Sequence, residues 1–349
     1  MAKRRSDLDE DDVRVRPGRN KPRARTKERP AHDAAVPAVV VTVDRGRLTC
    51  LLIDATSADA REVVAMKARE LGRSGIVVGD RVALVGDVSG EPDALARIVR
   101  VEPRSSVLRR SADDTDPVER VLVANADQLA VVTALADPEP RTGLIDRCLV
   151  AAYDSGLRPL LILTKSDLAG PEELLATYAA LDVPYVVLTK GSDLTELGGQ
   201  LEGRTTVLVG HSGVGKSTLV NALVPGADRA IGRVNAVTGR GRHTSSSAIA
   251  LRLPSDIETW VVDTPGVRSF GLAHVDPSRV IHAFPDLEAG TGECPRGCSH
   301  DEPECALDAW VAEGHASGER LASLRRLLRT RSDDERGVIA RDESAARDA

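Results

Sequence analysis

The chain has 349 residues and a formal net charge of −6, with 42% hydrophobic, 29% charged and only 2% aromatic residues. This composition is typical of a folded globular protein of two or three domains and excludes a disordered or fibrous chain. No apolar stretch approaches the roughly eighteen residues of a membrane span, and residues 1–7 lack the apolar core of a secretory signal. Five cysteines are too few for a disulfide scaffold, so we expect a cytoplasmic protein without a membrane partner.

Residues 1–35 are predicted to form a disordered basic arm. Between residues 13 and 30 the sequence has eight cations, one anion and no apolar periodicity, so burial would not offset its chain entropy. Two interpretations stay open: a solubilising tail, or an electrostatic contact for polyphosphate. Residues 13–30 carry +7, which leaves −13 for the rest of the chain. The mild overall acidity therefore does not exclude an RNA partner.

Residues 36–112 are predicted to form a small β-barrel, for which the oligonucleotide-binding (OB) type is one candidate. Alternating valines at residues 39–43 lead into a turn, and short apolar runs follow at residues 48–53, 82–85 and 98–101. Short strands broken by Gly, Asp and Pro over about seventy residues are typical of small closed barrels.

Residues 113–273 are predicted to form an α/β domain with a parallel sheet flanked by helices. Near-continuous apolar runs alternate with helical stretches, which indicates strands that are buried on both faces. The expected strands are Gln128–Leu135, Pro159–Thr164, Pro184–Leu188, Thr205–Val209, Ile249–Leu253 and Trp260–Val262.

A phosphate-binding motif follows the fourth of these strands. It reads Gly210, His211, Ser212, Gly213, Val214, Gly215, Lys216, Ser217 and Thr218, and it opens a helical stretch. Its glycines let the backbone N–H groups point inward, and the helix N-terminus adds favourable partial charge for phosphate. In this motif Lys216 is predicted to reach the β- and γ-phosphates, and Ser217 to bind Mg²⁺.

Two further motifs end neighbouring strands. In the first, Asp263-Thr-Pro-Gly266, the carboxylate suits a Mg²⁺-linked acid and the Gly266 N–H a sensor of the γ-phosphate. The second is Thr164, Lys165, Ser166 and Asp167. The Asp167 carboxylate would accept two N–H bonds from guanine, a donor pair that adenine lacks. Each motif alone is weak, but together with the phosphate loop they predict a GTPase.

The order of the motifs is unusual. In a Ras-like GTPase the base motif comes last, whereas here Thr164–Asp167 precedes the phosphate loop. The same sheet would form if the old ends were joined near residues 190–205 and new ends opened after Asp263–Gly266, which is a circular permutation. The segment after Gly266 then leads straight into the C-terminal domain, so nucleotide-dependent movement could be passed on covalently.

Residues 274–332 are predicted to form a zinc-binding α-helical domain, followed by a charged tail at residues 333–349. Three cysteines and one histidine lie within twelve residues: Cys294, Cys298, His300 and Cys305. A Cys₃His set suits a closed structural Zn²⁺ site, and redox chemistry is the alternative, although a C-x-x-C motif is lacking. Residues 321–329 have helical spacing, while Cys50 and Cys148 lie in apolar runs and are expected to be buried.

With these motifs in this order, the chain resembles the RsgA family, the circularly permuted, small-subunit-dependent GTPases of bacterial ribosome assembly. The resemblance covers about residues 37–330 and extends to the segment Asp263–Leu272. It implies an N-terminal OB-fold domain, a central GTPase and a C-terminal zinc domain that together grip the small ribosomal subunit.

The resemblance also implies roles for individual residues. Val267 replaces the glutamine that orients water in Ras, and His243 matches the family histidine thought to serve that purpose; the alternative is an exposed loop residue that contacts RNA. Thr244 is the best match for the threonine that senses Mg²⁺ and the γ-phosphate, with Ser245 as the alternative. Thr189 and Lys190 match the family's guanine-side loop loosely.

The expected function is that of a GTPase that hydrolyses GTP to GDP and phosphate on the small (30S) subunit, assists its late maturation and is stimulated by it. Mg²⁺ with GTP, one structural Zn²⁺, rRNA contacts and a monomeric state are expected. Because aromatic residues are rare, phosphate and shape contacts should dominate over base stacking. Two alternatives are an RNA-binding zinc scaffold that uses guanine nucleotide as a switch without functionally required hydrolysis, and a permuted GTPase that acts on the large subunit.

Overall fold

The structure is a computed structural model. It describes residues 32–44, 46–53, 61–72, 75–111, 119–227, 248–254, 258–264, 272 and 277–330. The predicted basic arm, apart from its last four residues, and the predicted tail at residues 333–349 lie outside the described residues. Among the described helices, none combines the length and apolar character that crossing a membrane requires.

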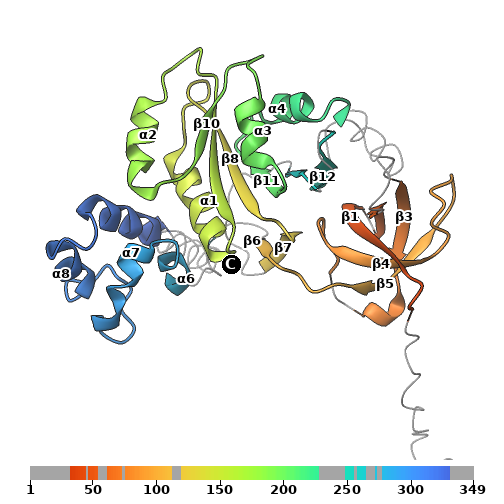
Figure 1. Cartoon of the computed structure of the whole chain (residues 1–349), viewed down its shortest axis with the longest axis horizontal. Coiled ribbons are helices and arrows are strands. Elements are labelled where there is room, and N and C mark those ends of the chain that lie inside the picture. The colour runs from red at the N-terminus through yellow and green to blue at the C-terminus, as the bar shows by residue number, and fades with distance from the viewer. Residues whose placement is uncertain are drawn as a thin grey trace, which may run out of the picture. The chain divides into compact units, whose positions relative to one another are not determined.

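The N-terminal strands form a small closed barrel (Figure 1). They are β1 (Val36–Asp44), β2 (Arg47–Leu52), β3 (Glu62–Lys67), β4 (Arg81–Gly86) and β5 (Ala96–Val101). Their order is β1-β2-β3-β5-β4, and β4 pairs again with β1, which closes the barrel. Ala38, Val40, Leu84 and Ile98 fill its interior without exposed surface. The predicted barrel is confirmed, and five strands match the OB type; β3 was not predicted because its apolar run is short and flanked by charges.

A two-stranded antiparallel hairpin follows the barrel. Its strands are β6 (Val107–Ser111) and β7 (Glu119–Ala124), and the register shifts between Leu108 and Arg109. The sequence did not predict this hairpin, because consecutive arginines interrupt the apolar alternation in β6. The domain boundary predicted after residue 112 falls between the two strands.

The α/β region is built on one ladder of strands in the order β10-β9-β8-β11-β13-β12 (Figure 1). They are β8 (Gln128–Ala134), β9 (Arg158–Thr164), β10 (Tyr185–Val187), β11 (Thr205–Val209), β12 (Ile249–Arg252) and β13 (Trp260–Asp263). All the predicted strands are present within two residues of their expected ends. The pairings are parallel except for β12 with β13, which is antiparallel. The short connection from β12 to β13 reverses the chain and cannot make a parallel crossover.

The strand order accounts for the unusual order of the motifs. The phosphate-loop strand β11 lies between β8 and β13, so β8, β9 and β10 continue the ladder on one side although they precede β11 in the chain. Residues 188–204, with helix α3 (Thr195–Leu201), connect β10 to β11. This is the connection that a circular permutation requires near residues 190–205.

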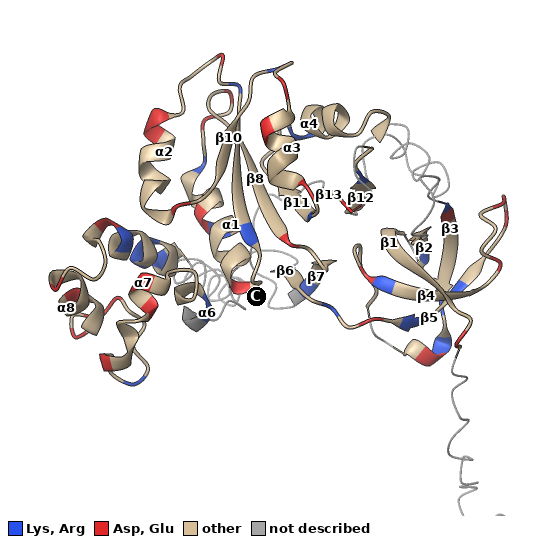
Figure 2. Cartoon of the chain, in the orientation of Figure 1, with Lys and Arg blue, Asp and Glu red and all other residues tan. Residues whose placement is uncertain are grey.

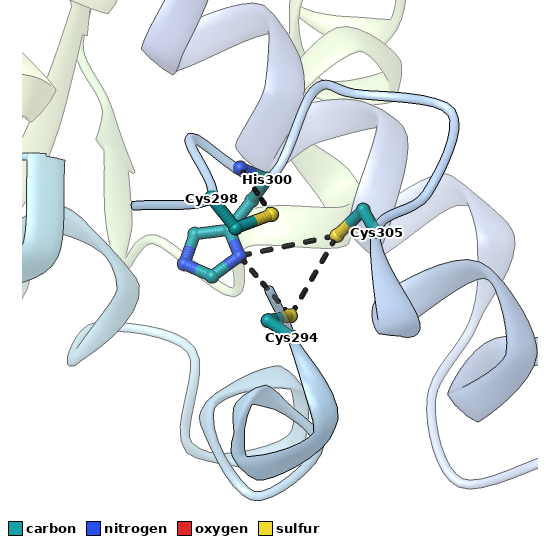
Figure 3. A group of neighbouring side chains, drawn as sticks. All are labelled: Cys294, Cys298, His300 and Cys305. Atoms are coloured by element: carbon teal, nitrogen blue, oxygen red, sulfur yellow. Dashed lines mark hydrogen bonds between the residues drawn. The ribbon is translucent and has the colours of Figure 1, made fainter. Parts of the chain in front are cut away.

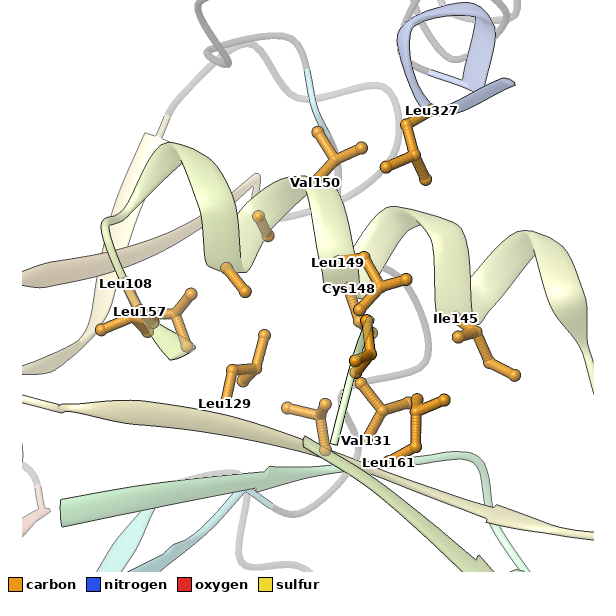
Figure 4. Packing of buried hydrophobic residues seen from close by; sticks show 14 of the residues in the cluster. Leu108, Leu129, Val131, Ile145, Cys148, Leu149, Val150, Leu157, Leu161 and Leu327 are labelled. Carbon is orange, nitrogen blue, oxygen red and sulfur yellow. The ribbon is translucent and has the colours of Figure 1, made fainter. Parts of the chain in front are cut away.

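The α/β sheet is buried on both faces. Every residue of β8 is buried, and alternate side chains enter different apolar clusters: Leu129 and Val131 one, Ala130 and Val132 the other. Figure 4 shows helix α1 (Thr142–Asp154) above the sheet, with its Cys148 near Leu161 of β9 among the packed apolar side chains. Each fully buried Leu or Val adds about 1.5–3 kcal/mol, so this core holds the strand ends firmly.

The C-terminal region consists of short helices. They are α6 (Pro277–Ile281), α7 (Pro285–Glu288), the 3-10 turn η4 (Thr291–Glu293), α8 (Ala306–Ala312) and a helical segment at residues 318–330. Leu321, Leu324, Leu327 and Leu328 are buried in the same apolar cluster as α1, and Figure 4 shows Leu327 beside Val150. The helix predicted at residues 321–329 is therefore confirmed.

Candidate nucleotide-binding and metal sites

The phosphate loop joins β11 to helix α4 (Lys216–Leu223). Gly213 and Gly215 have φ angles of 86° and 92°, in the left-handed region that favours glycine. A Cβ at Gly210 would lie 2.3 Å from the Val132 carbonyl oxygen of β8. The backbone path of the loop therefore requires these three glycines.

The amine of the phosphate loop meets the carboxylate of the D-x-x-G motif. Lys216 Nζ forms an ion pair with Asp263 Oδ1 and donates a hydrogen bond to the Thr264 carbonyl at 3.3 Å. The Thr264 hydroxyl donates to the Leu208 carbonyl at 2.7 Å, which ties this motif to β11. Ser217 follows Lys216 at the start of α4. Carboxylate and hydroxyl oxygens are the ligand types that Mg²⁺ prefers, so this donor set fits the ion.

A buried hydroxyl connects the base motif to the phosphate loop. Thr164 Oγ1 donates to the Val214 carbonyl at 2.6 Å and lies 3.3 Å from the Thr133 carbonyl. Thr164 and Val214 are both almost fully buried. The end of β9, and with it Asp167, is thereby held in a defined place relative to the phosphate loop.

A cavity of about 330 Å³ lies between the loop after β9, the loop after β10 and helix α4. Its lining residues are Thr164, Lys165, Asp167, Leu168, Leu188, Thr189, Lys190, Gly191, Ser192, Leu194, Gly215, Thr218, Leu219 and Ala222. Leucine side chains offer an apolar surface for a flat ring, and Asp167 supplies a polar group of the kind that orients a bound base. The geometry therefore suits a purine base attached to phosphates on the adjoining loop.

The two loops around this cavity are linked by side chains. The hydroxyls of Ser166 and Thr189 lie 2.7 Å apart. Ser192 Oγ accepts from the Thr189 N–H at 3.1 Å and donates to the Thr189 carbonyl at 2.7 Å, which closes a tight turn. Sequence reasoning missed Ser192 and the lining leucines. Ser192 could have been found from its spacing of three residues after Thr189, which is typical of a hydroxyl-capped turn.

The predicted nucleotide residues do not all line this cavity. Most of those from the base motif, the guanine-side loop and the end of the phosphate loop line the cavity, while Lys216 and Asp263 contact each other beside it. His211 lies apart from it, with Nδ1 2.9 Å from the Ser212 carbonyl oxygen. His243, Thr244 and Gly266 lie outside the described residues, so their roles stay predictions.

The cysteine–histidine cluster brings four donor atoms together, all within 4.8 Å of one another (Figure 3). Cys294 Sγ lies 3.7 Å from His300 Nδ1 and 3.9 Å from Cys305 Sγ, and Cys305 Sγ lies 3.9 Å from His300 Nδ1. A tetrahedron with Zn–S bonds of 2.3 Å has an edge of about 3.8 Å. The cluster therefore fits Zn²⁺, whereas the sulfurs are too far apart to be disulfide-bonded.

Charged side chains hold the loop that carries these donors. Glu302 accepts hydrogen bonds from the Ser299 backbone at 3.0 Å and hydroxyl at 2.8 Å, which lowers the pKa of Glu302 to about 2. Arg325 Nε donates to the His300 carbonyl at 2.9 Å, and its guanidinium forms a paired contact with Asp308. Burial lowers the pKa of His300, which favours the neutral imidazole that metal ions bind.

A second buried polar contact joins the helical segment 318–330 to the α/β region. Arg326 Nε lies 3.4 Å from Asp146 Oδ2 of α1, and Arg326 Nη1 donates to the Thr177 carbonyl at 3.2 Å. The Arg326 guanidinium also lies 5.1 Å from the centre of the Tyr178 ring. These partners belong to α1 and to α2 (Glu172–Tyr178), the helix that follows the base motif. Burial raises the pKa of Asp146, while the charge of Arg326 opposes this shift.

A phosphate loop, a carboxylate after β13 and a base motif after β9, arranged in permuted order around one sheet, define a circularly permuted P-loop GTPase. The model of the family described as RsgA GTPase matches residues 101–273. The "Small ribosomal subunit biogenesis GTPase RsgA" of Azotobacter vinelandii is 40% identical over 72% of this chain and 74% of its own length. Its namesake from Ectopseudomonas mendocina is 38% identical over 74% and 76%. The chain belongs to the RsgA GTPase family and is a GTP hydrolase.

Solved structures agree with this fold. The crystal structure of YjeQ from Thermotoga maritima has a TM-score of 0.62 at 26% identity and covers 85% of this chain and 98% of its own. That of YloQ, described as a circularly permuted GTPase, has a TM-score of 0.59 at 22% identity, with 87% and 97% covered. The permuted fold is confirmed, and neither the scaffold nor the large-subunit alternative is favoured by these relatives.

Proposed function

We propose that this protein hydrolyses GTP to GDP and phosphate on the small ribosomal subunit during its late maturation, and that the subunit stimulates the reaction. The observation that carries the guanine-nucleotide part is the single cavity shared by Asp167, Thr189 and Gly215, next to Lys216. The names of the relatives support the small subunit as the partner. We further propose that the protein works in the cytoplasm as a monomer and contacts rRNA.

Asp167 selects the base in this proposal. Guanine presents N1–H and the exocyclic N2 amine on one edge, and a carboxylate accepts both. Adenine has an acceptor at N1 and no amine at C2, so the Asp167 carboxylate would lose its partners. A site built to hydrogen-bond a donor pair rejects a ligand that lacks it by large factors.

Lys216 changes partner when the triphosphate binds. In the structure its amine is paired with Asp263. Phosphate oxygens carry more negative charge than one carboxylate, so the amine turns to the β- and γ-phosphates and leaves Asp263 free. Lys216 then stabilises the charge that develops on these oxygens during hydrolysis.

The metals have separate parts in the proposal. Mg²⁺, when bound, neutralises phosphate charge, and Ser217, Asp263 and Thr244 would hold it. His243 positions the attacking water, since the Val267 side chain offers no hydrogen-bonding group. Cys294, Cys298, His300 and Cys305 would hold one structural Zn²⁺, whose coordination leaves no open position for chemistry.

The test is GTP turnover measured with purified small subunits, with large subunits as the matched control. We expect small subunits to raise the rate at least about tenfold and large subunits to leave it unchanged. Equal rates in all three conditions would refute the proposed partner. The same assay without residues 1–35 measures the contribution of the basic arm.

A second experiment tests the base readout. An Asp167→Asn variant replaces one acceptor oxygen with an amide donor, which matches the carbonyl of xanthine at C2. We expect GTP affinity to fall about a hundredfold and affinity for xanthosine triphosphate to rise. Unchanged GTP affinity would remove Asp167 from the base site.

A further inference from the structure

A groove of about 670 Å³ lies on the barrel, and none of its residues belongs to the nucleotide or metal sites. It is bounded by the ends of β3 and β4, the start of β5 and the 3-10 turn η2 (Arg69–Leu71). Met66 and Leu95 line it with 45% and 43% of their surface exposed, among the most exposed large apolar side chains of the described residues. Exposed apolar side chains that share one hollow indicate a binding surface.

The groove also carries excess positive charge. Lys67, Arg69 and Arg97 line it together with one carboxylate, Glu70. Figure 2 shows where the basic and acidic residues of the barrel lie. Within the described part of the chain, the side chains of Arg69 and Arg97 have neither an ion pair nor a hydrogen bond. By contrast, Arg100 pairs with Glu102, and Arg104 pairs with the buried Asp80.

We propose that this groove binds an acidic segment of a partner protein that carries an aliphatic anchor. Carboxylates of the segment pair with the guanidinium groups of Arg69 and Arg97, whose planar donors match a carboxylate in a bidentate manner. An aliphatic side chain of the segment packs between Met66 and Leu95, and the flexible methionine adapts to its shape. Together, the ion pairs and the apolar packing give both arginines a counter-charge and bury the exposed apolar surface.

The composition of the barrel favours a protein segment over RNA. The first Phe, Trp or Tyr of the chain is Tyr153, so the barrel has no aromatic ring of the kind on which single-stranded bases stack. A phosphate backbone would pair with the arginines but would leave Met66 and Leu95 against polar groups. Residues 13–30 of the chain's own arm carry charge of the same sign as the groove, which excludes them. Residues 7–12 of the arm are acidic and contain a leucine, so they enter the test as a competing occupant.

The experiment uses the full-length protein and a fluorescein-labelled peptide, Asp-Leu-Glu-Leu-Asp-Glu, with anisotropy as the readout. One variant reverses the groove charge (Arg69→Glu with Arg97→Glu), and another removes the anchor surface (Met66→Ser with Leu95→Ser). The matched control reverses two exposed barrel arginines outside the groove, Arg47→Glu with Arg81→Glu. All six side chains are exposed, so the variants should fold, which circular dichroism checks. Basal GTP hydrolysis should stay unchanged in all of them, because none contributes to the nucleotide site.

We expect both groove variants to bind the peptide at least about tenfold more weakly and the control to bind within about twofold of the parent, where tenfold is 1.4 kcal/mol. Equal binding by the groove variants would overturn the proposal. So would equal binding of a peptide with serine in place of leucine, because charge alone would then suffice. An oligouridylate that loses affinity in the groove variants while the peptide does not would assign the groove to RNA. Markedly tighter peptide binding after deletion of residues 331–349 would assign it to the chain's own tail, and after deletion of residues 1–12 to the acidic residues 7–12.

Discussion

The nucleotide site and the cysteine–histidine cluster are held in place by different means. The nucleotide residues follow β9, β11 and β13, strands whose ladder and buried faces fix the loops. Even the polar groups already have partners there, as Lys216 has with Asp263 and Thr164 with Val214. The four metal donors lie on loops between short helices, where no strand supports them. We therefore expect the first site to be built by the fold and the second to depend on its metal.

Removal of zinc is the strongest way to test this difference. A structural zinc contributes on the order of 10 kcal/mol to the stability of a small metal-bound region. We expect Cys298→Ser, or treatment with a chelator, to release one equivalent of zinc and to expose residues 277–330 to limited proteolysis. Guanine nucleotide affinity should change less than about threefold, because the sheet does not use the cluster. Cys50→Ala, which removes a fully buried barrel thiol, is the control, and a zinc-free protein with an intact C-terminal region would contradict the comparison.

The converse test damages the fold-built site. Lys216→Ala removes the amine that stabilises phosphate charge, so GTP hydrolysis should fall by roughly 10²–10³-fold. Zinc content and the proteolysis pattern of the C-terminal region should not change. Lys190→Ala, at an exposed lysine on the rim of the same cavity, is the matched control and should have a much smaller effect. Loss of zinc in the Lys216 variant would show that the two sites are not independent.

Arg326 lies where the two regions meet and tests how they are coupled. Arg326→Leu leaves the buried Asp146 carboxylate without its cation, so unfolding free energy should drop by about 2 kcal/mol. The double variant with Asp146→Leu should recover most of this loss, because no buried charge remains. Urea titrations of the two variants and the parent measure the difference, and an equal loss in single and double variants would exclude a charge effect.

The same variant predicts a pH dependence. Burial raises the pKa of Asp146 above its ordinary value, so the folded state takes up the proton before the unfolded state does. Without Arg326, only the hydrogen bond with Tyr178 opposes that shift. The stability deficit of Arg326→Leu should therefore shrink as the pH falls from 7 toward about 5. A stability deficit that is constant over this pH range would indicate that lost packing, and not the buried charge, causes it.

How much of each site could be predicted from sequence depends on how its residues are brought together. Strand ends and motif residues were predictable because β8, β9 and β11 are continuous apolar runs and the glycines and charges follow them directly. The Cys₃His set was predictable because its members are close in sequence. The contact between Arg326 and Asp146 was not predictable, because these residues lie far apart in the chain and only tertiary packing brings them together. The groove at Met66 and Leu95 was missed for the same reason, because β3, β4 and β5 converge only in the closed barrel.

The smallest expected effect concerns the link between base motif and phosphate loop. Thr164→Val keeps the shape of the side chain but leaves the buried Val214 carbonyl without its 2.6 Å donor, at a cost of about 1–2 kcal/mol. Because this bond holds Asp167 in place relative to the phosphate loop, GDP affinity should fall by about fivefold or more, as measured by equilibrium binding of a fluorescent GDP. Thr164→Ser retains the hydroxyl and should bind like the parent. If Thr164→Ser binds GDP as weakly as Thr164→Val, the hydrogen bond alone does not hold the two motifs together, because the methyl group is needed as well. If neither variant changes affinity, the sheet ladder alone is sufficient to build the site.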